Sequence, residues 1–597
     1  MGVIEDHRIT TKVAGHEIDA ASVIVDNLDI WTSAIRNKSS AGRGGGSKRE
    51  LYGIKKLREL ILELAVRGLL VPQDPNDETA EVLAEKLAAE KDRLIKEGKI
   101  KKSKPLPSIA EEEEYFPVPK GWSWVRIQDI GHDLGQTTPS EEFTYIDVSS
   151  INKNYGSIEN PSILSASDAP SRARKNVKKG TVIYSTVRPY LLNIAVISDD
   201  FTPLPIASTA FAVIHPLKGV SAQYVYRYLR SPTFIKYVES VQTGIAYPAI
   251  NDKQFFSGLI ALPPEQEQQR IVAKVDELMA LCDQLEQQTE ASLTAHATLV
   301  EALLGALTNA VDHDSFQQAW QRIAQHFDTL FTTEQSIDQL KQTILQLAVM
   351  GKLTPQDPND EPASELLKKI ANKKAKLVKE GKIKKQKPAP LATNGDNEFD
   401  LPVGWEWTTL SQLGSFSGGK TPSKAKPEFW GGNIPWVTPK DMKVELIFNS
   451  EDHVTDLALD SGLAIIEPMS LLFVVRSGIL RRKFPVAIAN VPCTVNQDLK
   501  VLSLAQKELA NYLLVMMKGF ERHILKNLTK TGTTVESLRF EDFAKHYFML
   551  PPREEQNRIV AKVDELMALC DQLKARLNEA QTTQLQLADA IAEQTIA

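Results

Sequence analysis

A fifteen-residue segment, IVAKVDELMALCDQL, occurs twice in this chain, at 271–285 and, letter for letter, at 559–573. Two shorter segments repeat as well: PQDPND at 72–77 and 355–360, and KEGKIKK at 96–102 and 379–385. The long segment repeats at a distance of 288 residues and the short ones at 283. The chain therefore consists of two copies of one unit, and five extra residues enter the second copy between about 424 and 467.

The two copies are not equally alike along their length. Residues 55–104 and 263–285 are near-duplicates of 338–387 and 551–573, whereas the roughly 145 residues between these segments have diverged. This pattern indicates a constant frame that carries two variable inserts.

The constant frame is predicted to be helical. The apolar residues of 271–285 are spaced by four and three residues in turn, as in a coiled-coil seam: Ile271, Val275, Leu278, Cys282 and Leu285. The stripe recurs in 559–573, and a similar one runs through Leu57, Ile61 and Leu64 and through Leu340, Ile344 and Leu347. We expect the constant segments to pack helix against helix; amphipathic helices on an ordinary globular core are the alternative. Pro-Pro pairs at 263–264 and 551–552 suit helix starts.

The inserts are predicted to be mixed α/β domains. Strands are expected at 181–187, 206–214, 470–475 and 499–504, which are rich in β-branched and aromatic residues. Helices are expected at 222–238 and 508–524. A Gly/Ser-rich stretch at 39–48 reads as a flexible linker.

Composition limits the function classes. No run of 18 apolar residues occurs, which argues against a membrane span, and the N-terminus lacks the apolar core of a secretory signal. The three cysteines show no metal-ligand spacing, which fits a reducing cytoplasm. The formal charge is −6, so any nucleic-acid surface must come from local basic clusters.

The stretch GSFSGGKT at 414–421 matches the phosphate-binding pattern G-x-x-x-x-G-K-[ST]. The corresponding stretch of the first copy has Gln136 in place of Gly419 and Thr137 in place of Lys420. Pro422 and Pro427 follow where the motif needs a helix. The sequence therefore favours a turn shared by both copies over a nucleotide site.

Catalytic motifs are absent. The sequence contains no H-E-x-x-H, no G-x-S-x-G and no Asp/Asn-Pro-Pro-aromatic motif, so we expect a non-catalytic protein. What remains is a recognition surface. Short hydroxyl side chains, glycine N–H groups and strand-end Arg or Lys residues are good partners for phosphates and base edges. The candidate DNA-binding residues are Thr137, Thr138, Ser140, Arg188, Tyr190, Thr243, Gly244 and Tyr247 in the first insert, and Lys420, Thr421, Ser423, Trp436, Thr438, Lys440, Arg476, Arg481, Arg482, Lys530, Thr531, Gly532 and Thr533 in the second.

The Lys-rich segments 96–104 and 373–387 lie between a helix and the Pro-rich start of each insert. A solvated linker, a partner-binding arm and a DNA contact are all open interpretations.

These features together resemble the specificity subunit of type I restriction-modification enzymes. The resemblance rests on LPPEQEQQRIVAKVDELMALCDQL and LPPREEQNRIVAKVDELMALCDQL, on GWSW and GWEW before the inserts, on STVRPYLLN in the first insert and on GGKTPSKAKPEFWGGNIPWVTPKDM in the second. It covers the chain from about residue 50, and the PQDPND and KEGKIKK arms suggest the longer-chain subgroup.

The resemblance implies two mixed α/β target recognition domains, separated and joined by long antiparallel coiled-coil helices in a pseudo-two-fold repeat. Each domain would read one half of a bipartite, asymmetric sequence in double-stranded DNA. Two copies of a modification subunit would bind S-adenosylmethionine and methylate adenine, and restriction subunits would supply ATP-driven translocation and cleavage. No cofactor is expected in this chain, because S-adenosylmethionine, ATP and Mg²⁺ would belong to the partners.

The expected domain boundaries follow from the repeat. They are an N-terminal segment (1–50), a helical arm (51–114), the first recognition domain (115–262), a central helix and linker (263–337), a second arm (338–398), the second recognition domain (399–550) and a C-terminal helix (551–597). A coiled-coil scaffold without DNA recognition is the remaining alternative, but it gives no reason for two unlike inserts.

A direct test separates the DNA-recognition hypothesis from the nucleotide-binding hypothesis. We expect equilibrium dialysis with ATP to show no binding by the isolated chain, either as wild type or as Lys420→Ala. Saturable ATP binding that Lys420→Ala abolishes would instead establish a phosphate-binding loop at 414–421.

Overall fold

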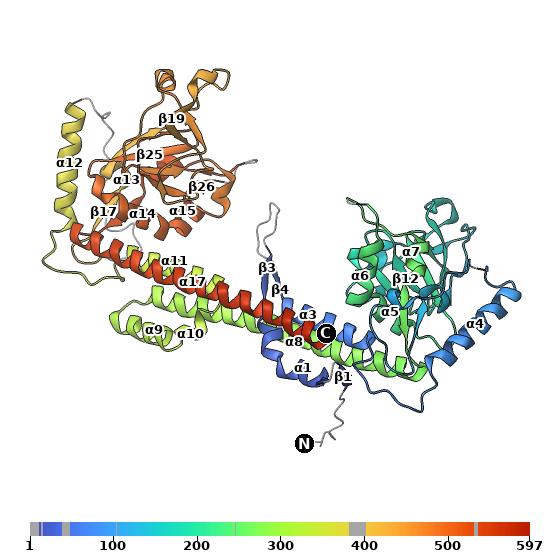
Figure 1. Ribbon diagram of the computed structural model, residues 1–597. Helices are drawn as coiled ribbons and strands as arrows, with labels where there is room; N and C mark the ends of the chain where they lie inside the picture. Colours follow the sequence, from blue (N-terminus) through green and yellow to red (C-terminus); the bar gives the residue numbers. More distant parts are fainter. Residues whose placement is uncertain are drawn as a thin grey trace. The chain divides into compact units, whose positions relative to one another are not determined.

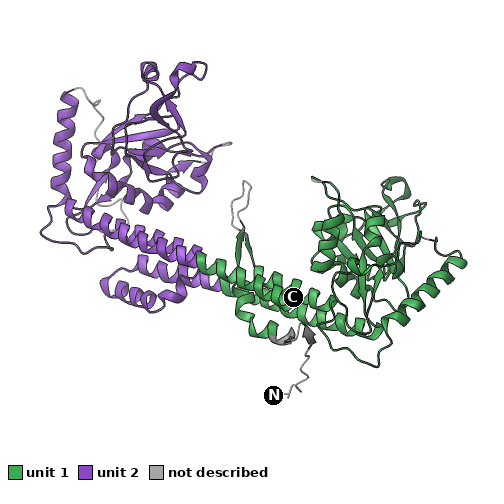
Figure 2. Cartoon of the chain, viewed as in Figure 1, with its two compact units in different colours: residues 1–293, 579–597 green, residues 294–578 purple. Residues whose placement is uncertain are grey.

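The computed structural model describes residues 11–13, 16–18, 20–38, 48–102, 104–244, 246–380, 401–530 and 535–596. The chain divides into two compact units, one formed by 1–293 with 579–597 and the other by 294–578 (Figures 1 and 2). The expected linker at 39–48 lies outside the described residues except for Lys48.

In the first unit, α3 (Tyr52–Val66) packs against the first part of α8 (Glu265–Asn309). The predicted seam residues are buried: Leu57, Ile61, Leu64, Ile271, Val275 and Cys282 all have an exposed fraction of 0%. At the margin of the seam, the Arg58 guanidinium donates to Asp283 at 2.5 Å and to Glu286 at 2.6 Å. The expected helix-against-helix packing is confirmed.

The end of α17 (Arg553–Ile596) completes the core of the first unit. Ala588 is fully buried among the residues of that core. The Tyr52 hydroxyl donates to Asp589 Oδ1 at 2.6 Å, and Arg67 donates to the carbonyl of Ile596 at 2.9 Å.

The second unit repeats this arrangement with the roles of the long helices exchanged. There α11 (Glu334–Val349) packs against the first part of α17, and Lys574 pairs with Asp338 at 3.2 Å. The end of α8 supplies Val300, Leu304 and Leu307 to the same core. Each unit therefore contains the beginning of one long helix and the end of the other.

The N-terminal segment contains a helix pair that the sequence repeat does not predict. A helix pair precedes each frame helix: α1 (Ala20–Asp26) and α2 (Leu28–Ser33) before α3, and α9 (His313–Gln325) and α10 (Phe327–Leu330) before α11. The linking residues have nearly the same backbone conformation, with φ −114° and ψ 21° at Asn27 and φ −117° and ψ 19° at His326. The segment also contains the hairpins β1 (Thr11–Val13)–β2 (His16–Ile18) and β3 (Arg36–Lys38)–β4 (Lys48–Glu50).

Each insert is closed by pairing the strand that leads in with the strand that leads out. In the first, β5 (Ser123–Arg126) pairs antiparallel with β16 (Leu259–Leu262). In the second, β17 (Glu406–Thr409) pairs with β28 (Tyr547–Leu550). Both ends of an insert therefore meet the frame at one place.

The inserts share one architecture. The order β13-β12-β15-β6 in the first corresponds to β23-β22-β25-β18 in the second, where β20 adds an edge strand. The bounds are β6 (Gly131–His132), β12 (Val182–Ser185), β13 (Ile194–Val196), β15 (Phe211–Pro216), β18 (Gly414–Gly418), β20 (Leu446–Ile447), β22 (Leu471–Val474), β23 (Val486–Ala489) and β25 (Leu499–Leu504).

A second sheet in each insert joins a parallel pair to antiparallel neighbours. Its order is β10-β7-β14-β11 in the first insert and β21-β19-β24 in the second, and β7–β14 and β19–β24 are the parallel pairs. The bounds are β7 (Phe143–Ile146), β10 (Ser162–Leu164), β11 (Ala173–Asn176), β14 (Pro205–Ser208), β19 (Trp430–Val437), β21 (Asp452–Val454) and β24 (Thr494–Val495). Short hairpins β8 (Ile151–Asn152)–β9 (Ser157–Ile158) and β26 (Thr529–Lys530)–β27 (Ser537–Leu538) complete the inserts. The mixed α/β expectation is confirmed.

Three expected elements are divided in the structure. The helix expected at 222–238 is two, α5 (Ala222–Leu229) and α6 (Pro232–Val241), because Pro232 cannot continue a helix and Ser231 caps the next one. The helix at 508–524 is likewise α14 (Ala510–Gly519) and α15 (Glu521–Asn527). The strand at 206–214 is the end of β14 and most of β15, which belong to different sheets.

The remaining α-helices of the described residues belong to the inserts or the arms. They are α4 (Ala80–Lys96), α7 (Asp252–Ser257), α12 (Ala363–Lys379), α13 (Leu410–Leu413) and α16 (Phe540–Lys545). Within the described residues, α8 is long and apolar enough to cross a membrane by length and composition alone. That criterion is weak, since core helices of soluble proteins also meet it, and the heptad stripe of α8 is buried at both of its ends.

The helices α3 and α11 end on glycines that no other residue can replace without strain. Gly68 has φ 71° and Gly351 has φ 68°. The following amides close the last turns, from Leu69 to the Leu64 carbonyl and from Lys352 to the Leu347 carbonyl, both at 2.9 Å. A Cβ atom at Gly351 would lie 2.6 Å from Pro402 Cγ.

Gly351→Ala should therefore lower the free energy of unfolding by about 2–4 kcal/mol, because left-handed backbone strain and overlap with Pro402 add. Gly98→Ala is the matched control, since Gly98 has φ 69° with nothing within 4 Å of a built Cβ atom. Its cost should stay at about 1–2 kcal/mol. Equal losses in urea unfolding would show that the contact with Pro402 contributes nothing.

Candidate nucleic-acid interface

A turn at Ser208–Ala210 organises one edge of the first insert. The Thr209 amide donates to the Arg172 carbonyl at 2.8 Å, and the Thr186 amide donates to the Ala210 carbonyl at 2.9 Å. The turn thus joins the start of β11 to the residues that follow β12. We call this edge, with the loops bonded to it, the first recognition edge.

Arg188 is the most constrained residue of the first recognition edge. Its backbone is left-handed, with φ 50° and ψ 57°, and its amide donates to the Pro248 carbonyl at 2.9 Å. The guanidinium lies 5.1 Å from the ring centroid of Tyr247, a side chain that is 68% exposed. Strained non-glycine residues gather at functional sites, and a stacked guanidinium keeps its N–H edge available to a ligand.

The other predicted residues of the first insert lie on or beside this edge. The Thr137 amide donates to the Arg174 carbonyl at 2.9 Å, and the Arg174 side chain donates to the Thr138 hydroxyl. Thr243 pairs with Ala249 through two backbone bonds of 2.9 Å, beside Gly244 at φ 91°. Ser140 and Tyr190 are exposed.

The second insert has a corresponding turn at Asn496–Asp498. The Asn496 amide donates to the Val437 carbonyl at 3.0 Å, and the Val475 amide donates to the Asp498 carbonyl at 2.9 Å. Arg476 Nε donates to Asp498 Oδ1 at 2.7 Å. The equivalent arginines therefore differ: Arg188 stacks on an aromatic ring, whereas Arg476 pairs with a carboxylate.

We call the edge at Asn496–Asp498, with the loops bonded to it, the second recognition edge. The loop after β18 that contains Lys420 and Thr421, here called the GKT loop, belongs to it. The Lys420 amide donates to the Val495 carbonyl at 3.0 Å, its ammonium donates to the Ser461 carbonyl, and the Thr421 hydroxyl contacts Gln497. Residues 414–418 form strand β18, and the loop after them leads through a short turn at Pro427–Phe429 into β19. Because no helix follows the loop, its amides do not form the phosphate cradle of a nucleotide site.

Some predicted residues of the second insert support the loops from inside. Trp436 is 6% exposed and donates from Nε1 to the Lys420 carbonyl at 3.1 Å. Thr438 is 8% exposed and bonds twice to Asp441, at 2.8 and 2.9 Å. Lys440, by contrast, is exposed and 3.7 Å from Glu451.

Arg481 and Arg482 follow the end of β22, as Arg476 does, whereas Lys530 ends β26. Arg481 Nε donates to Glu536 Oε1 at 2.5 Å, and the Ser477 amide donates to the Glu536 carbonyl at 3.2 Å. Arg482 and Lys530 are exposed. Thr531, Gly532 and Thr533 lie outside the described residues.

Sequence reasoning did not name the two turns that hold these edges together. Asn496, Gln497 and Asp498 stand where the first copy has Ser208, Thr209 and Ala210. Aligning the two copies at their offset of 288 residues reveals this contrast, because amide and carboxylate side chains replace small ones at equivalent positions. Arg174 was missed as well.

The comparisons with known proteins agree with this geometry. The family model described as type I restriction modification DNA specificity domain matches residues 119–295 and 402–581. The EcoAI specificity subunit of Escherichia coli is 39% identical over 96% of this chain and 99% of its own length, and the EcoEI subunit is 38% identical over 96% and 98%. The chain belongs to the type I restriction-modification specificity family.

This specificity subunit also resembles a solved HsdS subunit from Thermoanaerobacter tengcongensis, with 24% identity, a TM-score of 0.41, and coverage of 81% of this chain and 98% of that one. Each matched region contains one insert and the first part of the long helix after it. The inserts are the target recognition domains of a DNA specificity subunit, which is a non-catalytic component of its enzyme.

The specificity subunit offers a charge-matched test of the first recognition edge. Arg188→Ala should weaken binding to the cognate target by about 1–3 kcal/mol, because we expect Arg188 to contact a base edge or a phosphate. Lys179→Ala is the control, since Lys179 is exposed and precedes β12 whereas Arg188 follows it. Fluorescence anisotropy with the assembled complex measures both. Equal losses would indicate a general electrostatic effect in place of a contact at this edge.

Proposed function

We propose that each target recognition domain reads one half of a bipartite, asymmetric sequence in double-stranded DNA through its recognition edge. The observation that carries the proposal is the contrast between equivalent positions of one shared fold. Arg188 stacks on Tyr247, whereas the equivalent Arg476 pairs with the carboxylate of Asp498. The two domains therefore present different groups to a ligand at equivalent positions. Direct readout depends on such differences, since arginine favours guanine, amides favour adenine and carboxylates favour cytosine.

We assign the DNA contacts to the exposed members of the two edges. In the first domain these are Thr137, Thr138, Ser140, Arg188, Tyr190, Thr243, Gly244 and Tyr247. In the second they are Lys420, Ser423, Lys440, Arg476, Arg481, Arg482 and Lys530, and the partly exposed Thr421 joins them. We also propose contacts from Thr531, Gly532 and Thr533, which lie outside the described residues. Trp436 and Thr438 act through the loops that they hold, and Gln497 and Arg174 join the set.

The long helices would set the number of unread base pairs. Helix α8 has 45 residues and α17 has 44. At about 1.5 Å per residue each is about 65 Å long, which exceeds the roughly 34 Å between successive major-groove visits on one DNA face. A packed helix is stiff enough to serve as such a ruler.

The catalytic functions would belong to other subunits. Two modification subunits would dock on the repeated frame, bind S-adenosylmethionine and methylate adenine. Restriction subunits would use ATP and Mg²⁺ for translocation and cleavage. The complex would act on DNA in the cytoplasm, without a membrane.

Methylation mapping tests the proposal. The specificity and modification subunits would be co-expressed in a host without other modification, and modified adenines located by single-molecule sequencing. We expect one split, asymmetric motif with adenine modified on both strands. Replacing 115–262 with the corresponding domain of another specificity subunit should change one half-site only, because the frame is left intact. A complex that assembles without producing any motif would contradict DNA recognition by this chain.

A further inference from the structure

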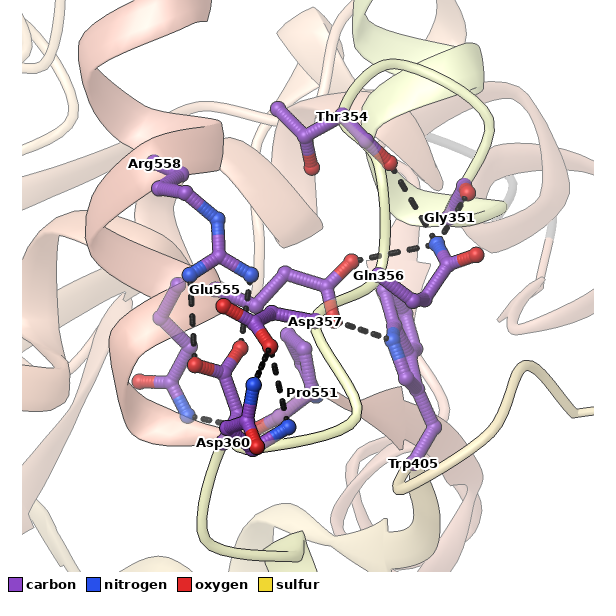
Figure 3. Close-up of polar contacts among 11 residues, drawn as sticks. Gly351, Thr354, Gln356, Asp357, Asp360, Trp405, Pro551, Glu555 and Arg558 are labelled. Atoms are coloured by element: carbon purple, nitrogen blue, oxygen red, sulfur yellow. Dashed lines mark hydrogen bonds and ion pairs between the residues drawn. The ribbon is translucent and has the colours of Figure 1, made fainter.

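The start of each long helix is fastened to its recognition domain and its arm by buried polar contacts. In the second unit, Glu555 lies in the first turn of α17 and has an exposed fraction of 0%. Its carboxylate accepts from Trp405 Nε1 at 2.9 Å and from Gln356 Nε2 at 3.2 Å (Figure 3). One turn later, Arg558 pairs with Asp360 at 2.6 Å. We call this cluster the junction.

The first unit contains the same junction, residue for residue. Glu267 of α8 is 1% exposed and accepts from Trp122 Nε1 at 3.0 Å and from Gln73 Nε2 at 3.2 Å. Arg270 pairs with Asp77 at 2.5 Å. Burial raises the pKa of Glu267, and the bonds from Trp122 and Gln73 act in the opposite direction. Such a buried carboxylate is tolerated only while its donors stay in place.

The PQDPND loop is also held by hydrogen bonds of its own, some of which Figure 3 draws for the second copy. Gln356 Nε2 also donates to the Gly351 carbonyl at 2.7 Å, and Asp357 accepts from the amide and side chain of Asn359, both at 2.9 Å. The loop therefore presents Gln356 and Asp360 to α17 in a fixed geometry.

The arm helices extend the fastening along each domain. The Ala363 amide at the start of α12 donates to the Gly404 carbonyl at 2.9 Å, and Lys374 donates to the Gly414 carbonyl at 3.0 Å. In the first unit, Ala80 donates to Gly121 at 2.8 Å and Lys91 to Gln128 at 2.5 Å. These arm lysines bind backbone carbonyls of the recognition domain, so they are not available to DNA phosphates.

We infer that the junction, together with its arm helix, is a positioning device that fixes each recognition domain on its long helix and thereby restricts the spacer lengths that the enzyme accepts. The inference rests on the proposed function. Adding one base pair moves a half-site by about 3.4 Å and turns it by about one tenth of a helical turn. Only a domain that is held rigidly on its ruler can reject such a change.

The test uses Glu267→Gln and Glu555→Gln. Glutamine has one acceptor oxygen for two donors, so each change breaks one bond and leaves a buried donor unpaired. Glu265→Gln and Glu554→Gln are matched controls, because these neighbouring carboxylates are exposed. The assembled methyltransferase would be assayed on targets with both cognate half-sites and spacers of the cognate length or one base pair shorter or longer.

We expect Glu267→Gln and Glu555→Gln each to raise methylation of the wrong-spacer targets, relative to the cognate target, by at least about tenfold, a loss of discrimination of about 1.4 kcal/mol. The half-site sequences should not change, and the controls should behave as wild type. Unchanged discrimination with a lowered melting temperature would overturn the inference and leave the junction a purely structural feature.

Gln73→Ala and Gln356→Ala provide a second route if the carboxylate variants fail to fold, because they remove one donor from a loop and leave the core intact. They should relax spacer discrimination in the same direction, and their failure to do so in a folded complex would also overturn the inference. The wild-type enzyme separates the two proposals: if it methylates no split target, the proposed function fails before spacer length is tested.

Discussion

The first turn of each long helix contains a buried carboxylate, Glu267 in α8 and Glu555 in α17, that accepts hydrogen bonds from two distant parts of the chain. A charge in that position is stable only when the tryptophan of the domain, the glutamine of the arm loop and the first helical turn are assembled together. Glu267 and Glu555 therefore tie the first turn of each long helix to its domain and its arm loop. The strand pairs β5–β16 and β17–β28 bring both ends of the domain to the same place. The rest of the domain is free to vary because so little of it takes part in the attachment.

The frame could be predicted from the sequence because its segments are repeated almost unchanged in both copies. Apolar residues that recur at the same spacing in both copies mark positions that face an interior, and Ile271, Val275 and Cys282 are fully buried. The helix pairs α1–α2 and α9–α10 could not be found in this way, since no sequence segment is repeated between them. The PQDPND repeat was visible, but its role was not, because the partners of Gln73 and Asp77 lie more than 190 residues away in sequence.

The recognition edges were predictable only in part. Strand-end arginines and hydroxyl-rich loops identified Arg188, Arg476 and Thr138 as candidates, and backbone bonds through the two turns bring these candidates to one edge in each domain. The pairing of Arg476 with Asp498, and the burial of Trp436 and Thr438, depend on tertiary contacts that spacing does not encode. Divergence between the copies was the useful signal for the recognition surface. Where the two domains share a fold but differ in their residues, the difference indicates a surface whose binding specificity can change.

The exchange of helix ends between the units bears on how the chain is made. The core of the first unit includes Ala588 and receives Tyr52 through Asp589, although these partners are separated by 537 residues. During synthesis, α3 therefore emerges long before the helix that covers it. Domains usually fold as they leave the ribosome. Here the first recognition domain can close early, but the part of its helical core that the end of α17 covers stays open until 579–596 have been added. The first unit is therefore completed late in the synthesis of the chain.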